Sequence, residues 1–592
     1  MQGILENYTG LKLLGNMNTK NLLLLNVIYQ KPLASTNWID YVYIVVKDIS
    51  TNEKRLITIE EPKMIVYFVK PEYRNYDYYP AHKLLSQCYQ KKLKYRKIIE
   101  SIVKESNDEK LKDYYMQCKA VSLEATKNIH KWPYVLASDY DYPNYFRIEW
   151  LLHYHNPNIR LDITKIYLDI EVDSIDVDGF PKPGECPINA ISLIDEFENT
   201  VHVFLLRNKN NPQIDEFESN TNDFLDRCHE MFDDSYGKLT YRVYMFDESE
   251  EIKLIQQTFA LIHKLKRDFL LVWNMSFDIP YIMARIDALG YNYKQILCDK
   301  DFNTEICYYR RDVHHYDWKV RNDQFTLTSY TVFLDQMSQY IKIRKGKSEL
   351  KSVKLNAVAW KELKDEKLDY NDEANIKTLP YVNYTKFVLY NIKDTLLQMG
   401  IERRTHDTDN TLLSALSNAT QYQNLFSQTI VLKSYAYISY YQQGYIIGNN
   451  KNIDYNKKKD EDEEDKKNKK DFEGALVCDP LLNDYVGINI FGKPSKFIFK
   501  NVIDYDFTSH YPMITISHNI NQETMIGKIV VSGFEHLNPD TTDILYDQGK
   551  AFVEALLTKD YGFIGNTYFN LPTTEEIINN LKEDKNEERN TI

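Results

Sequence analysis

The sequence predicts a protein of several domains that belong to the α/β and α+β classes. Its 592 residues are enough for about three to five domains with cores of their own. A hydrophobic fraction of 43% and a charged fraction of 27% are typical of a soluble globular protein. Between residues 161 and 405 apolar strand patterns alternate with helical patterns. This alternation favours an α/β layer built on a mixed sheet.

The N-terminal region, residues 1–160, is expected to combine a small antiparallel β-domain with a helical part. Short runs rich in Val, Ile, Leu and Tyr, separated by turn-like clusters, lie at residues 21–29, 41–46, 55–59 and 64–69. From residue 81 to about residue 131 the pattern becomes helical and basic. The basic cluster at residues 91–97 is interpreted as a solvated helix face, with a phosphate-contacting patch as the alternative.

The region 161–405 carries the alternating pattern. Strands are expected at residues 161–172, 190–194, 201–206 and 269–273, and helices at 281–289 and 381–404. Asp247 and Glu250 have the spacing of a capping box, and apolar residues follow at helical intervals. We therefore expect another helix to begin at Asp247.

The remaining chain is expected to form a helical linker at residues 406–471 and a further domain at residues 472–592. Lysines surround an acidic run in residues 455–471, which is typical of a disordered surface insertion. A strand is expected at residues 502–506, and the charged residues 579–592 are expected to fray.

Charge and cysteine content limit the class of protein. The formal net charge is −13, and residues 460–465 are all acidic; this argues against unspecific coating of nucleic acid, but not against a local binding groove. None of the seven cysteines forms a close pair of the zinc-site or redox type, so free thiols in a reducing compartment are expected. No leader pattern or bilayer-spanning apolar run is found. A cytoplasmic protein without a membrane partner is the default expectation.

Two acids interrupt the apolar pattern of the strand at residues 166–173. Side chains alternate along a strand, so Asp169 and Glu171 point to one face while Leu168 and Ile170 point to the other. Two acids on one buried face need a counter-charge, and a divalent cation held by oxygen ligands would supply it. An edge strand with a wet polar face is the alternative.

Two further acids stand at positions that favour a site. Asp278 follows the apolar strand 269–273, where α/β folds place their ligands. Tyr390 and Asp394 are four residues apart on an expected helix and so share one face. A helix cap for Asp278 and a surface ion pair for Asp394 are the alternatives.

Taken together, these motifs resemble a known family. Asp-Ile-Glu on a strand, Asn-x-x-Phe-Asp after a strand and Tyr-x-x-x-Asp on a helix, in this order, are similar to the three exonuclease motifs of family B DNA polymerases. The Asn-to-Phe spacing is the shorter of the two found in that family. Residues 354–359, Lys-Leu-Asn-Ala-Val-Ala, are similar to the segment before the third motif. The resemblance implies an RNase H-like 3′–5′ exonuclease domain at residues 161–405.

The resemblance also implies roles for single residues. The acids implied to hold two Mg²⁺ or Mn²⁺ ions are Asp169, Glu171, Asp278 and Asp394, and two metals of this kind clamp the attacking and leaving oxygens at phosphorus. Tyr390 would orient the attacking water. Asn274 and Phe277 would help to hold the unpaired 3′ end of single-stranded DNA.

A second set of residues resembles the start of a polymerase palm. Residues 473–480, which include Gly474 and Ala475, are similar to the segment that touches template DNA in this family. Residues 502–514 resemble the first palm motif, with His510 in place of the usual leucine. By this resemblance Asp506 and the Phe507 carbonyl would bind Mg²⁺, and Ser509 and Tyr511 would contact the incoming deoxynucleoside triphosphate, where Tyr511 would exclude a 2′-hydroxyl.

No fingers helix and no second palm motif follow Asp506. Asp407-Thr408-Asp409 precedes it and is therefore rejected as the missing metal site. Because one palm aspartate cannot replace carboxylates on both sides of the metals, we expect synthesis on a primer-template to need a second polypeptide. The composition resembles bacteriophage members, which would place the protein in the host cytoplasm. A stand-alone 3′–5′ exonuclease and a non-catalytic polymerase-derived scaffold remain as alternatives.

Overall fold

The computed structural model describes residues 21–74, 82–121, 125–159, 161–207, 211–313, 321–344, 352–369, 375–448 and 517. The chain divides into two compact units, Met1–Asn468 and Lys469–Ile592, and the first of them is described below. The predicted charged insertion and palm lie outside the described residues. The same holds for the residues predicted to act there, namely Gly474, Ala475, Asp506, Phe507, Ser509 and Tyr511.

The N-terminal region contains the predicted antiparallel sheet. Strands β1 (Leu22–Gln30), β2 (Tyr41–Asp48) and β3 (Lys54–Glu60) pair in this order. A second sheet places β4 (Met64–Val69) between β6 (Cys88–Leu93) and β7 (Val135–Leu136). Apolar residues from both sheets are buried, and for this reason the strands could be predicted from the apolar pattern of the sequence.

The prediction of a continuous helical segment from residue 81 is wrong at its start. Residues there form β5 (His82–Leu84) and β6, and helices α1 (Tyr95–Ser106) and α2 (Glu109–Val121) follow. The basic cluster therefore begins on a strand, where Lys91 contacts Glu105, and it continues to Lys94, which contacts Glu61. These partly exposed ion pairs fit a solvated face.

A six-stranded mixed sheet forms the centre of the next part and confirms the predicted α/β class. Its strands, in spatial order, are β11 (Thr240–Asp247), β10 (Thr200–Arg207), β9 (Ile188–Asp195), β8 (Lys165–Val172), β12 (Phe269–Val272) and β15 (Val332–Asp335). The pairs β8–β9 and β9–β10 are antiparallel, whereas β10–β11, β8–β12 and β12–β15 are parallel. The edge strands β11 and β15 were not predicted.

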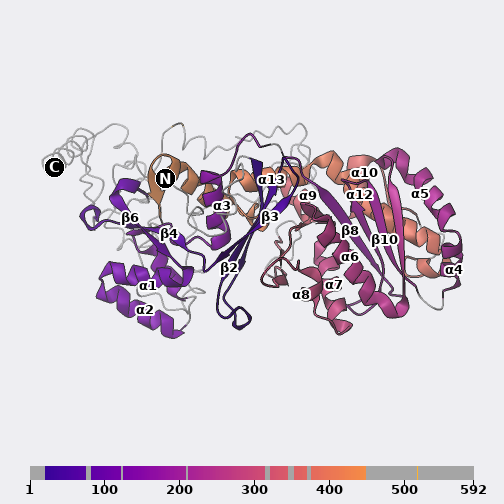
Figure 1. Cartoon of the computed structure of the whole chain (residues 1–592), viewed down its shortest axis with the longest axis horizontal. Coiled ribbons are helices and arrows are strands. Elements are labelled where there is room, and N and C mark those ends of the chain that lie inside the picture. The colour runs from indigo at the N-terminus through magenta and orange to yellow at the C-terminus, as the bar shows by residue number, and fades with distance from the viewer. Residues whose placement is uncertain are drawn as a thin grey trace, which may run out of the picture. The chain divides into compact units, whose positions relative to one another are not determined.

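Helices cover both faces of this sheet (Figure 1). On one face α12 (Tyr384–Thr405) contacts β8 and β9, and on the other α6 (Glu251–Leu265) and α7 (Met275–Ala288) share a core with alternate residues of β8. Leu168 and Ile170 belong to the core shared with α6 and α7. Because side chains alternate, Asp169 and Glu171 take the face of α12.

Three helix starts differ from the expected ones. Helix α7 begins at Met275 and not at residue 281, so Asp278 lies in its first turn. Helix α6 begins at Glu251 after a 3₁₀ turn, and the Asp247 side chain makes no capping hydrogen bond, so the predicted capping box is wrong. The helix predicted from residue 381 is divided in two, because Asn383 ends α11 (Leu379–Val382) and caps α12 by accepting a hydrogen bond from the Lys386 N–H.

The chain after α12 returns to the N-terminal region. Helix α14 (Gln428–Gln442) contacts α3 (Tyr142–His153), and β16 (Tyr445–Ile447) pairs with β5. The other elements are α4 (Pro212–Ser219), α5 (Thr221–Tyr236), α8 (Tyr293–Leu297), β13 (Cys307–Arg310), β14 (Gln324–Leu327), α9 (Gln336–Arg344), α10 (Leu355–Leu363) and α13 (Asp407–Ser417). The domain boundaries expected from the sequence stay predictions.

Two general expectations can be compared with the described part of the chain. Six of the seven cysteines lie in it, and all six are free and buried. Among the described helices, none has both the length and the apolar character needed to cross a bilayer.

A buried ion cluster connects the N-terminal sheet to the six-stranded sheet. The Nζ atoms of Lys47 and Lys54 lie 2.7 and 3.1 Å from carboxylate oxygens of Asp268, the residue before β12, and the three side chains are almost fully buried. Asp268 also accepts a hydrogen bond from the Thr164 N–H. Burial favours a raised pKa for Asp268, but the two ammonium groups outweigh it and lower the pKa. Burial lowers the pKa of Lys54 to about 8, although Asp268 opposes the shift.

We expect Asp268→Asn to destabilise this part of the chain by about 3–5 kcal/mol, because it leaves two buried ammonium groups without a counter-charge. Differential scanning calorimetry would show this as a lower Tm. Glu109→Gln is the control, since it removes only the exposed pair with Lys112 and should change the Tm little. Equal transitions for Asp268→Asn and the unchanged protein would contradict this account.

Candidate active site

Three of the predicted acids meet in the structure. Asp169 and Glu171 come from β8 and Asp394 from α12, and one carboxylate oxygen of each lies within 4.8 Å of the others. The three carboxylates come together because of the periods of a strand and of a helix. Alternate side chains of β8 face α12, and the helical period of α12 directs Asp394 toward β8. A carboxylate cluster of this kind suits Mg²⁺ or Mn²⁺, which prefer oxygen ligands.

Asp278 lies beside this cluster. It is buried in the first turn of α7, and the backbone of Ile170, the residue between the two acids of β8, partly opposes the rise in the pKa of Asp278. Its negative charge acts on Glu171 and that of Asp169 acts on it. The four predicted acids therefore share one electrostatic environment, and Asp278 approaches it from a different helix.

The cluster concentrates negative charge in a place where Asp169 and Glu171 are half-buried and Asp394 is buried. Burial, and then the neighbouring carboxylates, raise the pKa values of Asp169, Glu171 and Asp278 above their ordinary range. Burial also raises the pKa of Asp394, although Lys367 opposes it. Among the residues that the structure describes, the buried Oδ1 atom of Asp394 has no hydrogen-bond partner. An unpartnered acceptor within an all-carboxylate set fits a divalent cation, which would remove both the repulsion and the unpaired oxygen.

Lys367 is a site residue that sequence reasoning missed. Its Nζ atom contacts Asp394 and lies 3.1 Å from the Tyr390 hydroxyl. Burial lowers its pKa, but the attraction of Asp394 outweighs burial and the pKa is raised. In the sequence Lys367 stands in a charged stretch after a helix, which looks like solvent-exposed surface, so no local signal could have identified it.

Asn391, next to Tyr390 on α12, was also missed. Its Nδ2 atom donates a hydrogen bond to the Asp169 carboxylate at 3.0 Å. Its main-chain oxygen accepts hydrogen bonds from the hydroxyls of Ser192 and Thr395, which contact each other. Ser192 is the partner of Asp169 across the β8–β9 pair. This network of hydrogen bonds fixes α12 to the sheet and orients the carboxylate of Asp169.

The residues predicted to hold a strand end lie at the start of α7. The Oδ1 atom of Asn274 accepts a hydrogen bond from the Ser276 hydroxyl at 2.8 Å. The ring of Phe277 lies 5.1 Å from that of Phe180 and 5.3 Å from that of Tyr281. Phe180 is 77% exposed, which is unusual for a phenylalanine, and sequence reasoning did not identify it. An exposed ring in contact with Phe277, the residue before Asp278, offers a surface on which a base can stack.

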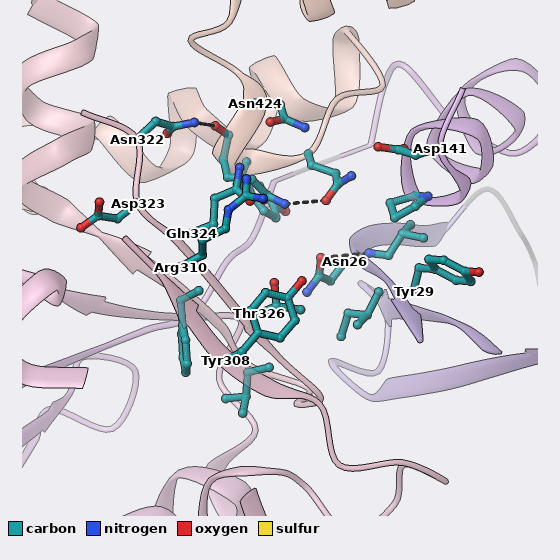
Figure 2. Close-up of a pocket in the computed structure, with 18 of the residues that line it drawn as sticks. Asn26, Tyr29, Asp141, Tyr308, Arg310, Asn322, Asp323, Gln324, Thr326 and Asn424 are labelled. Carbon is teal, nitrogen blue, oxygen red and sulfur yellow. Dashed lines mark hydrogen bonds between the residues drawn. The ribbon is translucent and has the colours of Figure 1, made fainter. Parts of the chain in front are cut away.

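A large cavity in the described part of the chain lies elsewhere. It has a volume of about 930 Å³ and lies between β1, the β13–β14 hairpin and α9 (Figure 2). None of the four acids lines it. A search for the largest cavities would therefore not identify the acid cluster. The cluster is recognised by its concentration of carboxylates.

The chain is similar to known proteins over most of the described region. Residues 97–358 match a family described as DNA polymerase family B, exonuclease domain. The chain is also 25% identical over 401 residues to the DNA-directed DNA polymerase of Escherichia phage RB69. The alignment covers 65% of this chain and 39% of that polymerase, so the chain spans about two fifths of the length of this curated relative. The family match includes Asp169, Glu171 and Asp278 and ends before Tyr390.

Glu171→Gln is expected to stabilise the metal-free protein, because it removes one of several repelling carboxylates. In the presence of a chelator the Tm should rise by about 2–4 °C, the shift that about 1 kcal/mol produces in a domain of this size. Adding Mn²⁺ should raise the Tm of the unchanged protein through binding to the folded state and should no longer raise that of the variant. The exposed Asp176 gives the control Asp176→Asn, and an equal Mn²⁺ response in all three proteins would contradict a metal site here.

Asn391→Ala should weaken Mn²⁺ binding about 10–100-fold, since partners that orient a metal ligand have effects of this size. Isothermal titration with Mn²⁺ in the absence of DNA measures the affinity directly. Thr395→Val provides a comparison, because it removes a hydroxyl from the same hydrogen-bond network without removing the hydrogen bond to Asp169. If both variants bound Mn²⁺ equally well, Asn391 would have only a packing role.

Proposed function

We propose that this chain removes nucleotides from the 3′ end of DNA by metal-dependent hydrolysis, because residues 97–358 match the exonuclease domain of DNA polymerase family B. The observation that carries this proposal is the close approach of the carboxylate groups of Asp169, Glu171 and Asp394. The oxygen of a water molecule forms a bond to the last phosphorus, and the bond from phosphorus to the preceding 3′ oxygen breaks. The products are a deoxynucleoside monophosphate and a strand with a new 3′-hydroxyl.

The four acids Asp169, Glu171, Asp278 and Asp394 would hold two divalent ions, Mg²⁺ or Mn²⁺. Bound ions would neutralise phosphate charge and favour the hydroxide form of water. The protein itself holds the carboxylates in the positions that metal binding requires. Asn391 orients Asp169, and the first turn of α7 positions Asp278.

Tyr390 would position the attacking water. Burial and the charge of Asp394 raise its pKa far above the ordinary value, so its hydroxyl keeps its proton and acts by hydrogen bonding. Lys367 holds that hydroxyl from one side at 3.1 Å. The Lys367 ammonium group also supplies positive charge near the place where negative charge develops on the phosphate.

The strand end would be held by residues at the start of α7. The exposed ring of Phe180 and its neighbour Phe277 provide stacking faces for the terminal bases, a contact that any of the four bases can make. The side chain of Asn274 would contact the last nucleotide. Such a site requires an unpaired end, because stacking on a protein ring replaces stacking on the next base pair.

The wider role that we propose is proofreading during DNA replication, in the cytoplasm of a host cell. A relative is named a DNA-directed DNA polymerase, which supports this role. In the same proposal Asp506, the Phe507 carbonyl, Ser509 and Tyr511 begin a polymerase palm, and Gly474 and Ala475 touch the template. DNA synthesis on a primer-template with deoxynucleoside triphosphates would need a second polypeptide with the remaining palm carboxylates.

The decisive test is digestion of a single-stranded oligonucleotide labelled at its 5′ end. With Mg²⁺ or Mn²⁺ the unchanged chain should shorten the strand one nucleotide at a time from the 3′ end. Asp169→Ala with Glu171→Ala should reduce the rate to the background level, because the metal ligands are lost. Digestion that continued at the normal rate would refute the assignment.

Two controls make the result specific. Asp176→Ala removes an exposed acid close in sequence to the cluster and should digest DNA normally, and circular dichroism should show that both variants keep their folded structure. In a parallel reaction with primer-template and the four deoxynucleoside triphosphates, we expect shortening of the primer only. Primer extension by this chain alone would disprove the need for a second polypeptide.

A further inference from the structure

The loop that joins β8 to β9 carries the exposed ring of Phe180. It comprises residues 173–187, and none of these described residues belongs to a helix or a strand. Irregular loops of about 12–15 residues or more are uncommon in compact domains and are usually functional. The contacts at the two ends of this loop determine how its ring is presented next to the acid cluster.

The end of the loop next to β9 is fixed to α7. Arg285 of α7 donates a hydrogen bond to the Gly184 carbonyl at 3.1 Å, and its guanidinium group lies 2.6 Å from a carboxylate oxygen of Glu251. A Cβ atom on Gly184 would lie 2.7 Å from the main-chain carbonyl carbon of Ala284, so the two backbones are in direct contact. A helix that belongs to the core of the six-stranded sheet therefore fixes this half of the loop.

The end next to β8 is held by the segment that leads into α12. The Nζ atom of Lys377 donates hydrogen bonds to two main-chain oxygens of the loop, that of Val177 and, at 2.7 Å, that of Gly179. Tyr381 of α11 donates a hydrogen bond from its hydroxyl to the Asp173 carboxylate at 2.5 Å. The loop is thus attached to the segment before α12, the helix that supplies one acid of the cluster.

Lys377 binds the loop immediately before the exposed ring. Gly179 has a φ of +82°, a left-handed conformation that favours glycine, and Phe180 follows it. The Phe180 ring is 77% exposed, and its centroid lies 5.1 Å from that of Phe277. Without the hydrogen bonds from Lys377 the loop would be free to turn this ring onto nearby apolar surface, which the hydrophobic effect favours. The contacts therefore keep Phe180 where it can meet a ligand.

We propose that Lys377 is a positioning residue that holds the Phe180 ring in its stacking orientation before DNA binds, with Tyr381 in the same role. A ring that is already in place loses little conformational freedom when a terminal base stacks on it, so the base is bound more tightly. Lys377 therefore helps the site to select an unpaired 3′ end, whose last base is free to stack. This inference rests on the proposed function, in which Phe180 and Phe277 stack on the end of the strand.

The binding test compares two oligonucleotides that differ only in the last base. All proteins carry Asp169→Ala and Glu171→Ala and are kept in a chelator, so that no DNA is digested. The probes are a labelled short thymidine oligonucleotide with a normal 3′ nucleotide and the same strand with an abasic 3′ nucleotide. Fluorescence anisotropy gives the affinity for each probe, and the ratio of the two affinities measures the stacking of the last base.

We expect the parent protein to bind the normal strand about tenfold more tightly than the abasic one, the effect of one base stacked on a protein ring. Lys377→Met keeps the length of the side chain without its donors and should abolish this ratio. The control Lys182→Met removes a positive charge from an exposed position of the same loop and should keep the ratio. A parent ratio of one, a ratio that Lys377→Met leaves unchanged, or an equal loss in Lys182→Met overturns the proposal.

A double-mutant cycle separates action through Phe180 from a direct contact with DNA. Phe180→Ala alone should also abolish the ratio. Adding Lys377→Met to Phe180→Ala should cause no further loss of affinity, because the ring that Lys377 positions is already absent. A further loss as large as the loss in the presence of Phe180 would show that Lys377 itself contacts DNA, and this result overturns the positioning role.

Hydrogen exchange measured by mass spectrometry reports on the loop without DNA. The Val177 N–H donates a hydrogen bond to the Ser174 carbonyl at 3.2 Å, in the half of the loop that Lys377 holds. In Lys377→Met, amides of residues 174–180 should exchange about tenfold faster or more, because local opening is easier there. Amides of residues 184–187 should keep their rates, which also shows that the variant folds. Unchanged exchange in residues 174–180 overturns the proposal.

Digestion distinguishes a failure of this inference from a failure of the proposed function. In the protein with all four acids and with Mn²⁺ present, Lys377→Met should still remove 3′ nucleotides, with KM raised about tenfold and kcat changed less than about twofold. An unchanged KM overturns the positioning role and leaves the exonuclease proposal intact. Absence of digestion by the unchanged protein refutes the exonuclease proposal, and the exchange rates then still decide whether Lys377 holds the loop.

Discussion

The repulsion among four neighbouring carboxylates is the constraint on which the rest of the structure depends. Asp169, Glu171 and Asp394 converge and Asp278 acts on them electrostatically; Asp278 and Asp394 are buried, where charge is costly. Lys367 contributes one positive charge to this set, which leaves the cluster negative when the acids are ionised. A protein tolerates such an arrangement only if other contacts impose it, and the cluster suits divalent cations, which would remove the repulsion.

Those contacts come from the sheet and from α12. The six-stranded sheet fixes β8 on both sides, and the hydroxyls of Ser192 and Thr395 attach α12 to the strand next to β8. Helix α7 starts directly after β12, so the first turn that carries Asp278 is placed by the strand before it. The same strand is anchored at its other end, where Asp268 pairs with Lys47 and Lys54 of the N-terminal sheet. The N-terminal region thus supports the acid cluster without contributing a carboxylate to it.

The acid cluster and the large cavity lie on neighbouring elements of this scaffold. The acid cluster concentrates negative charge and suits cations, whereas the cavity beside the β13–β14 hairpin is lined by cationic, acidic and neutral residues. Strand β15 and helix α9 follow each other directly in the chain and line the cavity, while β15 pairs with β12, which leads to Asp278.

The sequence alone determined which acids act together in pairs. Asp169 and Glu171 share a face because the strand period is two, and Tyr390 and Asp394 share a face because they are one helical turn apart. These are local rules, and they hold whatever surrounds the segment. The mixed sheet was predicted for the same reason. Strand β11 was missed because polar residues interrupt its apolar pattern, and β15 was missed because its apolar run is only three residues long.

Only the tertiary structure decided which residues from other segments complete the site. Lys367, Asn391 and Phe180 have no local signal, since each looks like an ordinary surface or helix residue until α12 and the loops are packed on the sheet. The first turn of α7 and the position of the cavity were decided in the same way. The physical reason is that a periodic pattern depends on neighbours in the chain, whereas the partner of a side chain depends on how whole apolar faces are buried against one another.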